Sequence, residues 1–280
     1  MKKLSPIIEW FTLLFCTGTV LAFLVIILYD LISSGLPALS WKFVTTLPSN
    51  GMTKGGILPA ITGTVILTLL TAVVAVPLGI SCAIYLNEYA PDHWVTRLIR
   101  ASIRNLSGVP SIIYGLFGLA LFVKGLHMGT SVIAAGLTLG LLSLPYIIST
   151  TEEALRRIPA STREAALGIG ATQFESIRDV VLPSALPGIL TGVVLTLSRA
   201  AGETAPILFT GVAFYITGSS GFLNQEFMAL PYHLYMLSTQ HQSIVEVRPL
   251  AYGTALVLII VVFLLNLTAF YIRYKHSNNE

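Results

Sequence analysis

The sequence predicts an all-α membrane protein with six transmembrane helices, and three observations support this fold class. Of the 280 residues, 54% are hydrophobic and only 10% are charged, whereas a soluble domain carries about 25% charged residues. The mean hydropathy is +0.80. Six stretches approach the roughly 20 mostly apolar residues that a helix needs to cross the hydrocarbon core. An ordinary soluble enzyme, a disordered chain and a nucleic-acid binder are excluded, since the net charge of +3 is too small to bind a phosphate backbone.

The six spans are expected in order along one undivided membrane unit. The first follows two lysines, as a signal peptide does, but its apolar run exceeds the 7–15 residues of such a core, which favours a retained span. Shorter Gly- or Ser-containing stretches form the third and fourth spans, and Pro206 interrupts the fifth. The predicted spans are 10–31, 60–86, 106–123, 132–149, 186–216 and 250–272. They divide the chain into a first helix with an external loop (1–57), a core (58–272) and a tail (273–280).

The basic residues predict the orientation, because cytoplasmic loops carry an excess of Lys and Arg. Six spans place both termini on the same side as the loops 87–105 and 150–185. That side holds Lys2, Lys3, Arg97, Arg100, Arg104, Arg156, Arg157, Arg163, Arg178, Arg273 and Lys275, against Lys42, Lys54, Lys124 and Arg248 on the other. Both termini are therefore expected in the cytoplasm.

Cysteine and histidine residues indicate neither a disulfide framework nor a metal site. Cys16 and Cys82 both lie in apolar stretches. The histidines of the external loops, His127, His233 and His241, lack metal-ligand spacing and are interpreted as surface residues.

The stretch 91–105 is expected to form an amphipathic helix. One face carries apolar residues such as Leu98 and Ile99, and another carries Arg97, Arg100 and Arg104. We interpret it as a helix at the lipid headgroups rather than as a docking helix.

The loop between the fourth and fifth spans is the most organised polar segment. The S-x-x-E pattern at 161–164 is a capping box and predicts a helix after Ser161, which Gly168 and Gly170 are expected to end. A second capping box at 172–175 predicts another helix, ended by Pro183. A capped connector at the membrane surface would show the same pattern.

The residue types in this loop resemble the EAA signature of ABC-importer permeases. That signature reads E-A-A, three residues, glycine, nine residues, isoleucine, one residue, leucine-proline, and every spacing is kept here. The resemblance implies a type I, MetI-like permease architecture and a loop, 161–183, that docks on a cytoplasmic ATPase. The chain itself has no Gly-Lys dipeptide and hence no phosphate-binding loop for ATP. The matching residues are Glu164, Ala165, Ala166, Gly170, Val180 in place of isoleucine, Leu182 and Pro183.

A charged pair is expected inside the fifth span. Arg199 follows Leu186 by 13 residues, which is roughly 20 Å along a helix that rises 1.5 Å per residue. A charge at that depth costs about 2.5–3.5 kcal/mol or more. Glu203 lies one turn further, so the two side chains can meet on one face. The pair either lowers its own insertion cost or faces a cavity or a permease interface, and we favour the functional interpretation.

Two further segments resemble phosphate-transport permeases. Residues 198–210, S-R-A-A-G-E-T-A-P-I-L-F-T, match the R-A-x-G-E-T-A-P pattern, and 108–118, G-V-P-S-I-I-Y-G-L-F-G, resembles part of that family's third span. The resemblance covers most of 58–272 and is closest to the PstA type. It implies a bacterial inner-membrane subunit that is not an enzyme and binds no cofactor, since ATP and Mg²⁺ belong to the ATPase. The implied partners are a PstC-like sister permease, two PstB-like ATPase copies, a PstS-like periplasmic phosphate-binding protein and the lipid bilayer.

The chemistry of the pair suits an anion. Arg199 offers a planar, always-charged fork to an oxyanion, and Glu203 can accept a hydrogen bond from a protonated phosphate oxygen that sulfate lacks. Alternatively, Glu203 only balances Arg199 and an external binding protein sets specificity. Other readings are a permease for molybdate or sulfate, or an intramembrane enzyme using Glu203. Further candidates along the substrate pathway are Thr204, Ser107, Ser111 and Tyr114.

Overall fold

The computed structural model describes residues 6–216 and 223–277. Lys2 and Lys3, the end of the predicted tail 273–280, and part of the external loop that follows the fifth span lie outside the described residues. Within them, five helices are long and apolar enough to cross a membrane, and a bent pair supplies a sixth crossing. This agrees with the six predicted spans.

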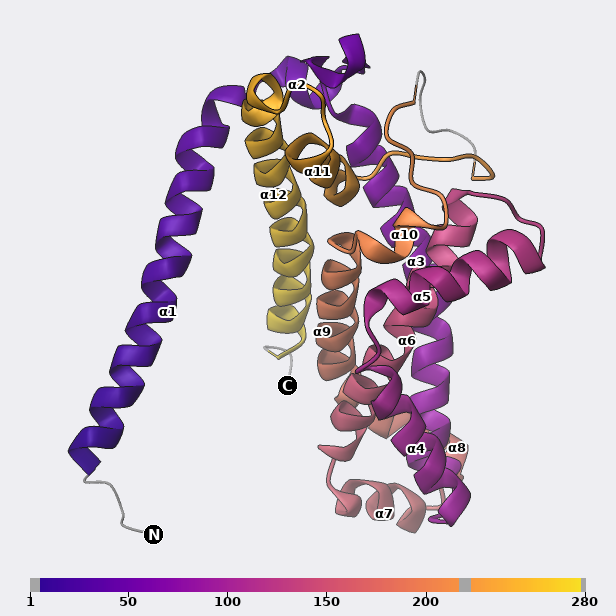
Figure 1. Cartoon of the computed structure of the whole chain (residues 1–280). Coiled ribbons are helices and arrows are strands. Elements are labelled where there is room, and N and C mark those ends of the chain that lie inside the picture. The colour runs from indigo at the N-terminus through magenta and orange to yellow at the C-terminus, as the bar shows by residue number, and fades with distance from the viewer. Residues whose placement is uncertain (1–5, 217–222, 278–280) are drawn as a thin grey trace.

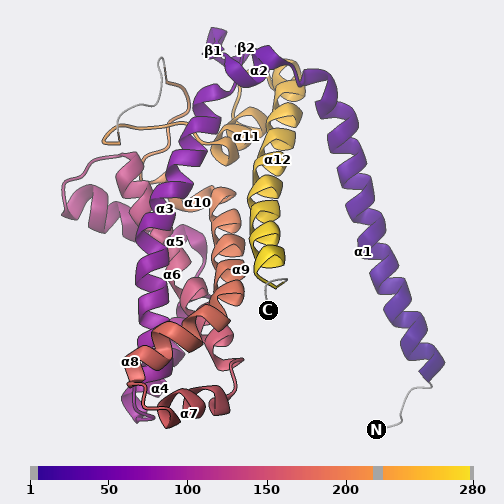
Figure 2. The same ribbon diagram turned by 180° about the vertical axis from the view of Figure 1, so that it is seen from behind.

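The first helix leans away from the rest of the molecule. α1 (Pro6–Gly35) joins the body near its end, where Tyr252 donates a hydrogen bond to Asp30 over 3.0 Å (Figures 1 and 2). Apart from the half-buried Leu31, its large described apolar side chains are exposed, a surface that is stable only in lipid or against another protein. A small cap follows, made of η1 (Leu36–Ala38), α2 (Trp41–Thr45), β1 (Pro48–Ser49), η2 (Asn50–Met52) and β2 (Lys54–Gly55), with the two strands paired antiparallel.

Two long helices form the centre of the bundle. α3 (Leu58–Ile84) continues as a π-helical turn, η3 (Tyr85–Tyr89), and packs along α6 (Val132–Arg156). Glycine permits this close contact, since a Cβ on Gly79 would lie 2.6 Å from the side chain of Ile147. Small residues let membrane helices approach in the same way in general.

The third crossing is bent, which corrects the predicted span 106–123. α4 (Trp94–Leu106) ends before Ser107, and the chain turns by 101° into α5 (Ser111–Gly118) and the π helix η4 (Leu119–Gly125). Pro110 explains the turn. Proline disfavours the helical conformation of the residue before it, and it has no backbone N–H to donate to a preceding helical turn.

α4 only partly fits the interpretation as a headgroup helix. Leu98 and Ile99 are exposed as expected, whereas Ile103 is half-buried against Leu86 and its neighbours. Arg100, however, turns inward: its Nε lies 3.2 Å from Oε1 of Glu152, and its Nη2 donates to the carbonyl of Leu86. The contact with Glu152 has no hydrogen-bond geometry, so it is an ionic contact that joins α4 to α6.

The segment 161–183 differs from the prediction at two points. α7 (Ala160–Gly168) begins before Ser161 without a side-chain cap, so the first capping box is wrong. Thr172 does cap α8 (Gln173–Glu175) with a complete capping box, as predicted. Pro183 does not end that helix, since the π helix η5 (Ser176–Val181) leads directly into α9 (Leu182–Ala201). Proline has no backbone N–H to donate. A π turn shifts the hydrogen-bond register of the helix, so the helix can continue past a residue without that donor.

The fifth span is shorter than predicted. α9 ends at Ala201, and a non-helical link precedes α10 (Ala205–Leu208). The break therefore comes before Pro206 and not after it. Pro206 lies in the first turn of α10, where its missing N–H is not needed, so it starts a helix instead of interrupting one.

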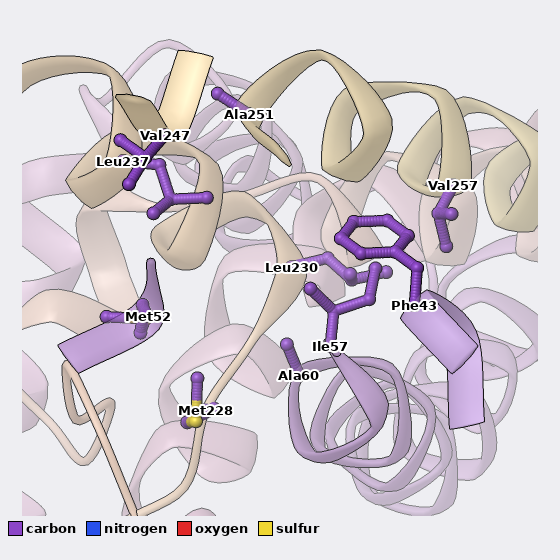
Figure 3. Packing of buried hydrophobic residues seen from close by; sticks show 10 residues of the cluster. All are labelled: Phe43, Met52, Ile57, Ala60, Met228, Leu230, Leu237, Val247, Ala251 and Val257. Atoms are coloured by element: carbon purple, nitrogen blue, oxygen red, sulfur yellow. The ribbon is translucent and has the colours of Figure 1, made fainter. Parts of the chain in front are cut away.

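The external end has its own core. Side chains from α2, the start of α3, α11 (Leu230–Thr239) and α12 (Ile244–Ser277) converge there (Figure 3). His233 of α11 is only 4% exposed, with its Nδ1 3.4 Å from the hydroxyl of Thr254. The prediction of a surface histidine is thus wrong for His233, because α11 packs against α12 instead of lying in an open loop. Burial lowers the pKa of His233 to about 4, whereas His127 is exposed as expected.

Candidate functional site

Arg199 and Glu203 meet at the end of α9, as predicted. The Nε of Arg199 lies 3.5 Å from Oε1 of Glu203. Arg199 is in the last helical turn, and Glu203 lies in the link to α10. In Figure 1, α9 ends below both α2 and α11, so the end of α9 that carries the pair lies within the depth of the bundle.

The guanidinium of Arg199 is open. The Arg199 side chain is 53% exposed and that of Glu203 16%. Within the described residues, the guanidinium forms this ion pair but no hydrogen bond to protein. An arginine carries five N–H donors, so most of them remain available to a ligand.

Tyr146 is the residue of this site that sequence reasoning missed. The guanidinium carbon of Arg199 lies 4.4 Å from the centre of the Tyr146 ring, which is a cation–π contact. The Tyr146 hydroxyl donates to the carbonyl of Ser107 over 2.8 Å and so fixes the ring. The only available signal was a tyrosine after Pro145 in an otherwise aliphatic stretch.

The other predicted pathway residues are less directly placed. The carbonyl of Ser107 accepts the hydrogen bond from Tyr146, while the Ser107 hydroxyl donates to the carbonyl of Ile103 over 3.3 Å. The Tyr114 hydroxyl donates to the carbonyl of Leu106 over 3.0 Å. Ser111 and Thr204 are half-buried, and neither side chain has a hydrogen bond among the described contacts.

The two segments that resemble phosphate permeases pack against each other. A Cβ on Gly115 would lie 3.0 Å from the carbonyl oxygen of Ala205 and 3.0 Å from the Cα of Pro206. α5 and α10 are thus in backbone contact, and glycine is needed at that position.

A groove lies between α6 and α9, and its lining residue Leu195 is one helical turn before Arg199. It has a volume of about 380 Å³. Thr150, Thr191 and Ser184 line it, and Glu153 and Arg157 line it near the end of α6. Polar side chains on facing helices are typical of a path for a hydrophilic solute.

The EAA-like residues lie on a protruding helix. Glu164 and Ala165 of α7 are exposed, and Ala166 is buried. Glu164 makes no hydrogen bond or ion pair among the described contacts, so it does not cap its own helix. Gly170 ends the turn with φ +94°, which only glycine adopts without strain. In α9, Leu182 is half-buried and Pro183 exposed.

Exposed apolar side chains occur in α7 and in the residues that follow it. Leu167 is 49% exposed, Phe174 62% and Ile169 88%. Exposed apolar groups are typical of a surface that contacts lipid or another protein.

A second arginine–glutamate pair anchors the segment to α3. Arg163 donates to both carboxylate oxygens of Glu88, with Nε 3.0 Å from Oε2 and Nη2 2.7 Å from Oε1. It also donates to the carbonyls of Ile158 and Leu155 over 2.8 and 3.0 Å. The hydrogen bonds that Arg163 donates to Glu88 raise the pKa of Arg163 further, so the guanidinium stays charged. The sequence offered no signal for this pairing across 75 residues.

Comparison with known proteins decides the family. Residues 75–276 match the model of the family described as binding-protein-dependent transport system inner membrane component. The chain belongs to this family. It is an inner-membrane permease with the type I, MetI-like fold of ABC importers and is not an enzyme, which rules out the intramembrane enzyme considered above.

Individual relatives cover most of the permease. It is 37% identical over 247 residues, 85% of the chain and 82% of the relative, to the phosphate transport system permease protein PstA of Xylella fastidiosa (strain Temecula1). It is 36% identical over 195 residues to the probable ABC transporter permease protein YqgI of Bacillus subtilis, covering 70% of the chain and 66% of the relative. A bacterial ABC transporter involved in alginate import shares the fold, with a TM-score of 0.67 and 15% identity over 95% of the chain and 96% of that structure.

Proposed function

We propose that this permease forms half of the translocation pathway of an ATP-driven phosphate importer. The observation that carries the proposal is the open guanidinium of Arg199 within the depth of the bundle, beside a carboxylate and over a tyrosine ring. The similarity to a phosphate permease along 85% of the chain supports phosphate as the substrate.

The pair provides a means of selecting hydrogen phosphate. Arg199 binds two oxyanion oxygens with parallel N–H groups, and Glu203 accepts a hydrogen bond from a protonated oxygen. Sulfate has no such proton at neutral pH, so the carboxylate repels it. From this site the anion passes along the groove between α6 and α9 to the cytoplasm.

The pathway requires partners. The exposed face of Arg199 fits a PstC-like sister permease, which would close the other half of the path. A PstS-like protein delivers phosphate from the periplasm, and two PstB-like ATPase subunits bind ATP and Mg²⁺, so this chain binds no cofactor. Both termini are cytoplasmic in this arrangement. α1 runs toward the cap and α12 runs away from it, which supports termini on the same side of the membrane (Figures 1 and 2).

The segment 161–183 couples the permease to the ATPase. Glu164, Ala165 and Ala166 present α7 to a cleft on that subunit, and Gly170 sets the angle to α8. Replacing Gly170 with valine forces a β-branched residue to φ +94°, a conformation that costs about 1–2 kcal/mol for a residue with a Cβ. We expect this variant to fold but to uncouple ATP hydrolysis from uptake.

Uptake of labelled phosphate into vesicles that contain the full complex tests the proposal. ATP-dependent uptake should persist in excess unlabelled sulfate, and Arg199→Ala should reduce it about 100-fold at unchanged assembly, because each charge-assisted hydrogen bond contributes about 1.5–3 kcal/mol. Glu203→Gln should let sulfate compete. If the complex assembles and hydrolyses ATP but takes up no phosphate, the assignment of phosphate as the substrate is wrong. If Arg199→Ala leaves uptake unchanged, the assignment of Arg199 to the substrate site is wrong.

A further inference from the structure

The π-helical turn at the end of α3 is a junction between four helical elements. The carbonyl of Leu86 accepts a hydrogen bond from Arg100 of α4. The carboxylate of Glu88 binds Arg163 of α7, and the Glu88 carbonyl accepts from Nε2 of Gln173 of α8 over 2.8 Å. π turns leave carbonyls without their usual helical donors and occur often at functional sites.

The Glu88 side chain is held from several sides. It is 6% exposed, and Arg163 is 23% exposed. Oε1 accepts from Arg163 and, over 2.7 Å, from Nδ2 of Asn87, while Oε2 accepts from Arg163. A bidentate pair with these additional bonds has one geometry and little freedom to rotate.

α7 also packs against η5. Ala166 is its one buried residue within the described chain. A Cβ added at Gly168 or Gly170 would meet nothing within 4 Å, so the turn that follows α7 is open. Among the described contacts, Arg163 is the residue of α7 that hydrogen-bonds to the end of α3, so it links the helix that faces the ATPase to that transmembrane helix.

α3 connects this junction to the external end. It runs the length of the molecule beside α6 (Figures 1 and 2), and the hydroxyl of Thr64 near its start accepts a hydrogen bond from the amide of Leu230 over 2.9 Å. A hydrogen bond thus joins the external end of α3 to the start of α11.

We infer that Glu88 is a positioning residue that clamps α7 to α3, so that the coupling segment and α3 move as one body when the ATPase closes. The inference rests on the proposed function, since it names the link between the docking helix and the external end of the pathway. The clamp converts a push on α7 into movement of α3, and without it α7 would pivot about its glycine turn.

The first test measures phosphate uptake per ATP hydrolysed by the complete complex in vesicles. Glu88→Ala should lower this ratio about tenfold, a coupling loss within the usual range for linked sites, while the ATPase stays bound and active. Arg163 keeps two carbonyl acceptors in this variant, so the fold should hold. Arg97→Ala is the matched control, because Arg97 forms an exposed ion pair with Asp92 at 3.9 Å on the same face. Wild-type uptake per ATP in Glu88→Ala, or a proportional fall in the control, would refute the clamp.

The second test follows the two helices directly and does not depend on the substrate. Spin labels are placed at Ser161→Cys on α7 and Val73→Cys on α3, both exposed positions, after replacement of Cys16 and Cys82. ATP binding should leave the distance between the labels unchanged in the otherwise wild-type complex and should change it in Glu88→Ala. A distance that changes with ATP while Glu88 is present would overturn the clamp. If the complex transports no phosphate, the substrate assignment fails, and this distance still decides the clamp.

Discussion

The permease contains two arginine–glutamate pairs that differ in almost every respect. Arg199 and Glu203 are neighbours on one turn and touch through a single contact of 3.5 Å, with the arginine 53% exposed. Arg163 and Glu88 come from different elements, form two hydrogen bonds of 3.0 and 2.7 Å, and are 23% and 6% exposed. In the first pair, most N–H donors of the arginine are unused. In the second pair, nearly all N–H donors of the arginine are used.

This difference separates binding from transmission. An anion can bind only where donors remain free, so an open pair suits a transient ligand. A closed pair has nothing to offer a ligand but keeps two elements in a fixed relation. The same residue types thus serve opposite purposes, and the number of satisfied donors decides which.

The largest expected effect is on stability, at the closed pair. Arg163→Ala leaves the Glu88 carboxylate, 6% exposed, without its cation, and breaking a buried pair costs about 3–5 kcal/mol. Glu88→Ala should cost less, because Arg163 retains the carbonyls of Leu155 and Ile158. Denaturant unfolding of the purified permease in detergent measures both variants. Equal losses would contradict the asymmetry.

The open pair should respond to geometry more than to charge. Arg199→Lys keeps the positive charge but loses the planar fork. Phosphate uptake should fall about tenfold, corresponding to one lost charge-assisted hydrogen bond, with no change in thermal stability. Uptake equal to wild type would show that Arg199 acts only as a point charge.

The ring of Tyr146 is expected to orient the guanidinium of Arg199 and so to increase phosphate uptake. Tyr146→Leu removes the cation–π contact, which is worth about 0.5–2 kcal/mol, so uptake should fall about threefold to tenfold. Tyr146→Phe keeps the ring and loses only the bond to the Ser107 carbonyl, so it serves as the matched control. A Phe variant as impaired as the Leu variant would assign the effect to the hydroxyl.

The smallest expected effect is that of mild acid on the free energy of unfolding. It limits the pH range in which the two pairs can be compared. His233 has a pKa of about 4 when folded and 6.5 when unfolded, so the unfolded chain binds more protons in this window. Stability is full above pH 6.5 and declines as the pH falls toward 4, with about 0.7 kcal/mol lost between pH 7 and pH 6. Melting curves at the two pH values measure the loss. It should vanish in His233→Gln and persist in His127→Gln, where the histidine is exposed.

Regular features of this fold were predictable because they depend on neighbours in the sequence. Apolar length predicts the spans, one-turn spacing predicts the contact of Arg199 with Glu203, and the capping box of Thr172 forms as its pattern indicates. The role of Pro183 was not predictable, because a π turn accommodates it. The same proline rule fails at Pro206, which starts α10.

Features that depend on tertiary packing escaped the sequence. Glu88 and Arg163 are 75 residues apart, and no local pattern joins them. Tyr146 meets Arg199 only because α6 and α9 pack side by side. His233 is buried because α11 folds onto α12. The division of the chain at 57/58 remains a prediction, although α3 begins at Leu58.

The separation of Glu88 from Arg163 along the chain also has a consequence for biosynthesis. Chains are made from the N-terminus, so α3 leaves the ribosome long before residue 163. Until then the Glu88 carboxylate lacks the cation that it has in the finished protein. The junction therefore closes late, once residue 163 has been made, and a nascent chain halted before that residue should lack the bidentate pair.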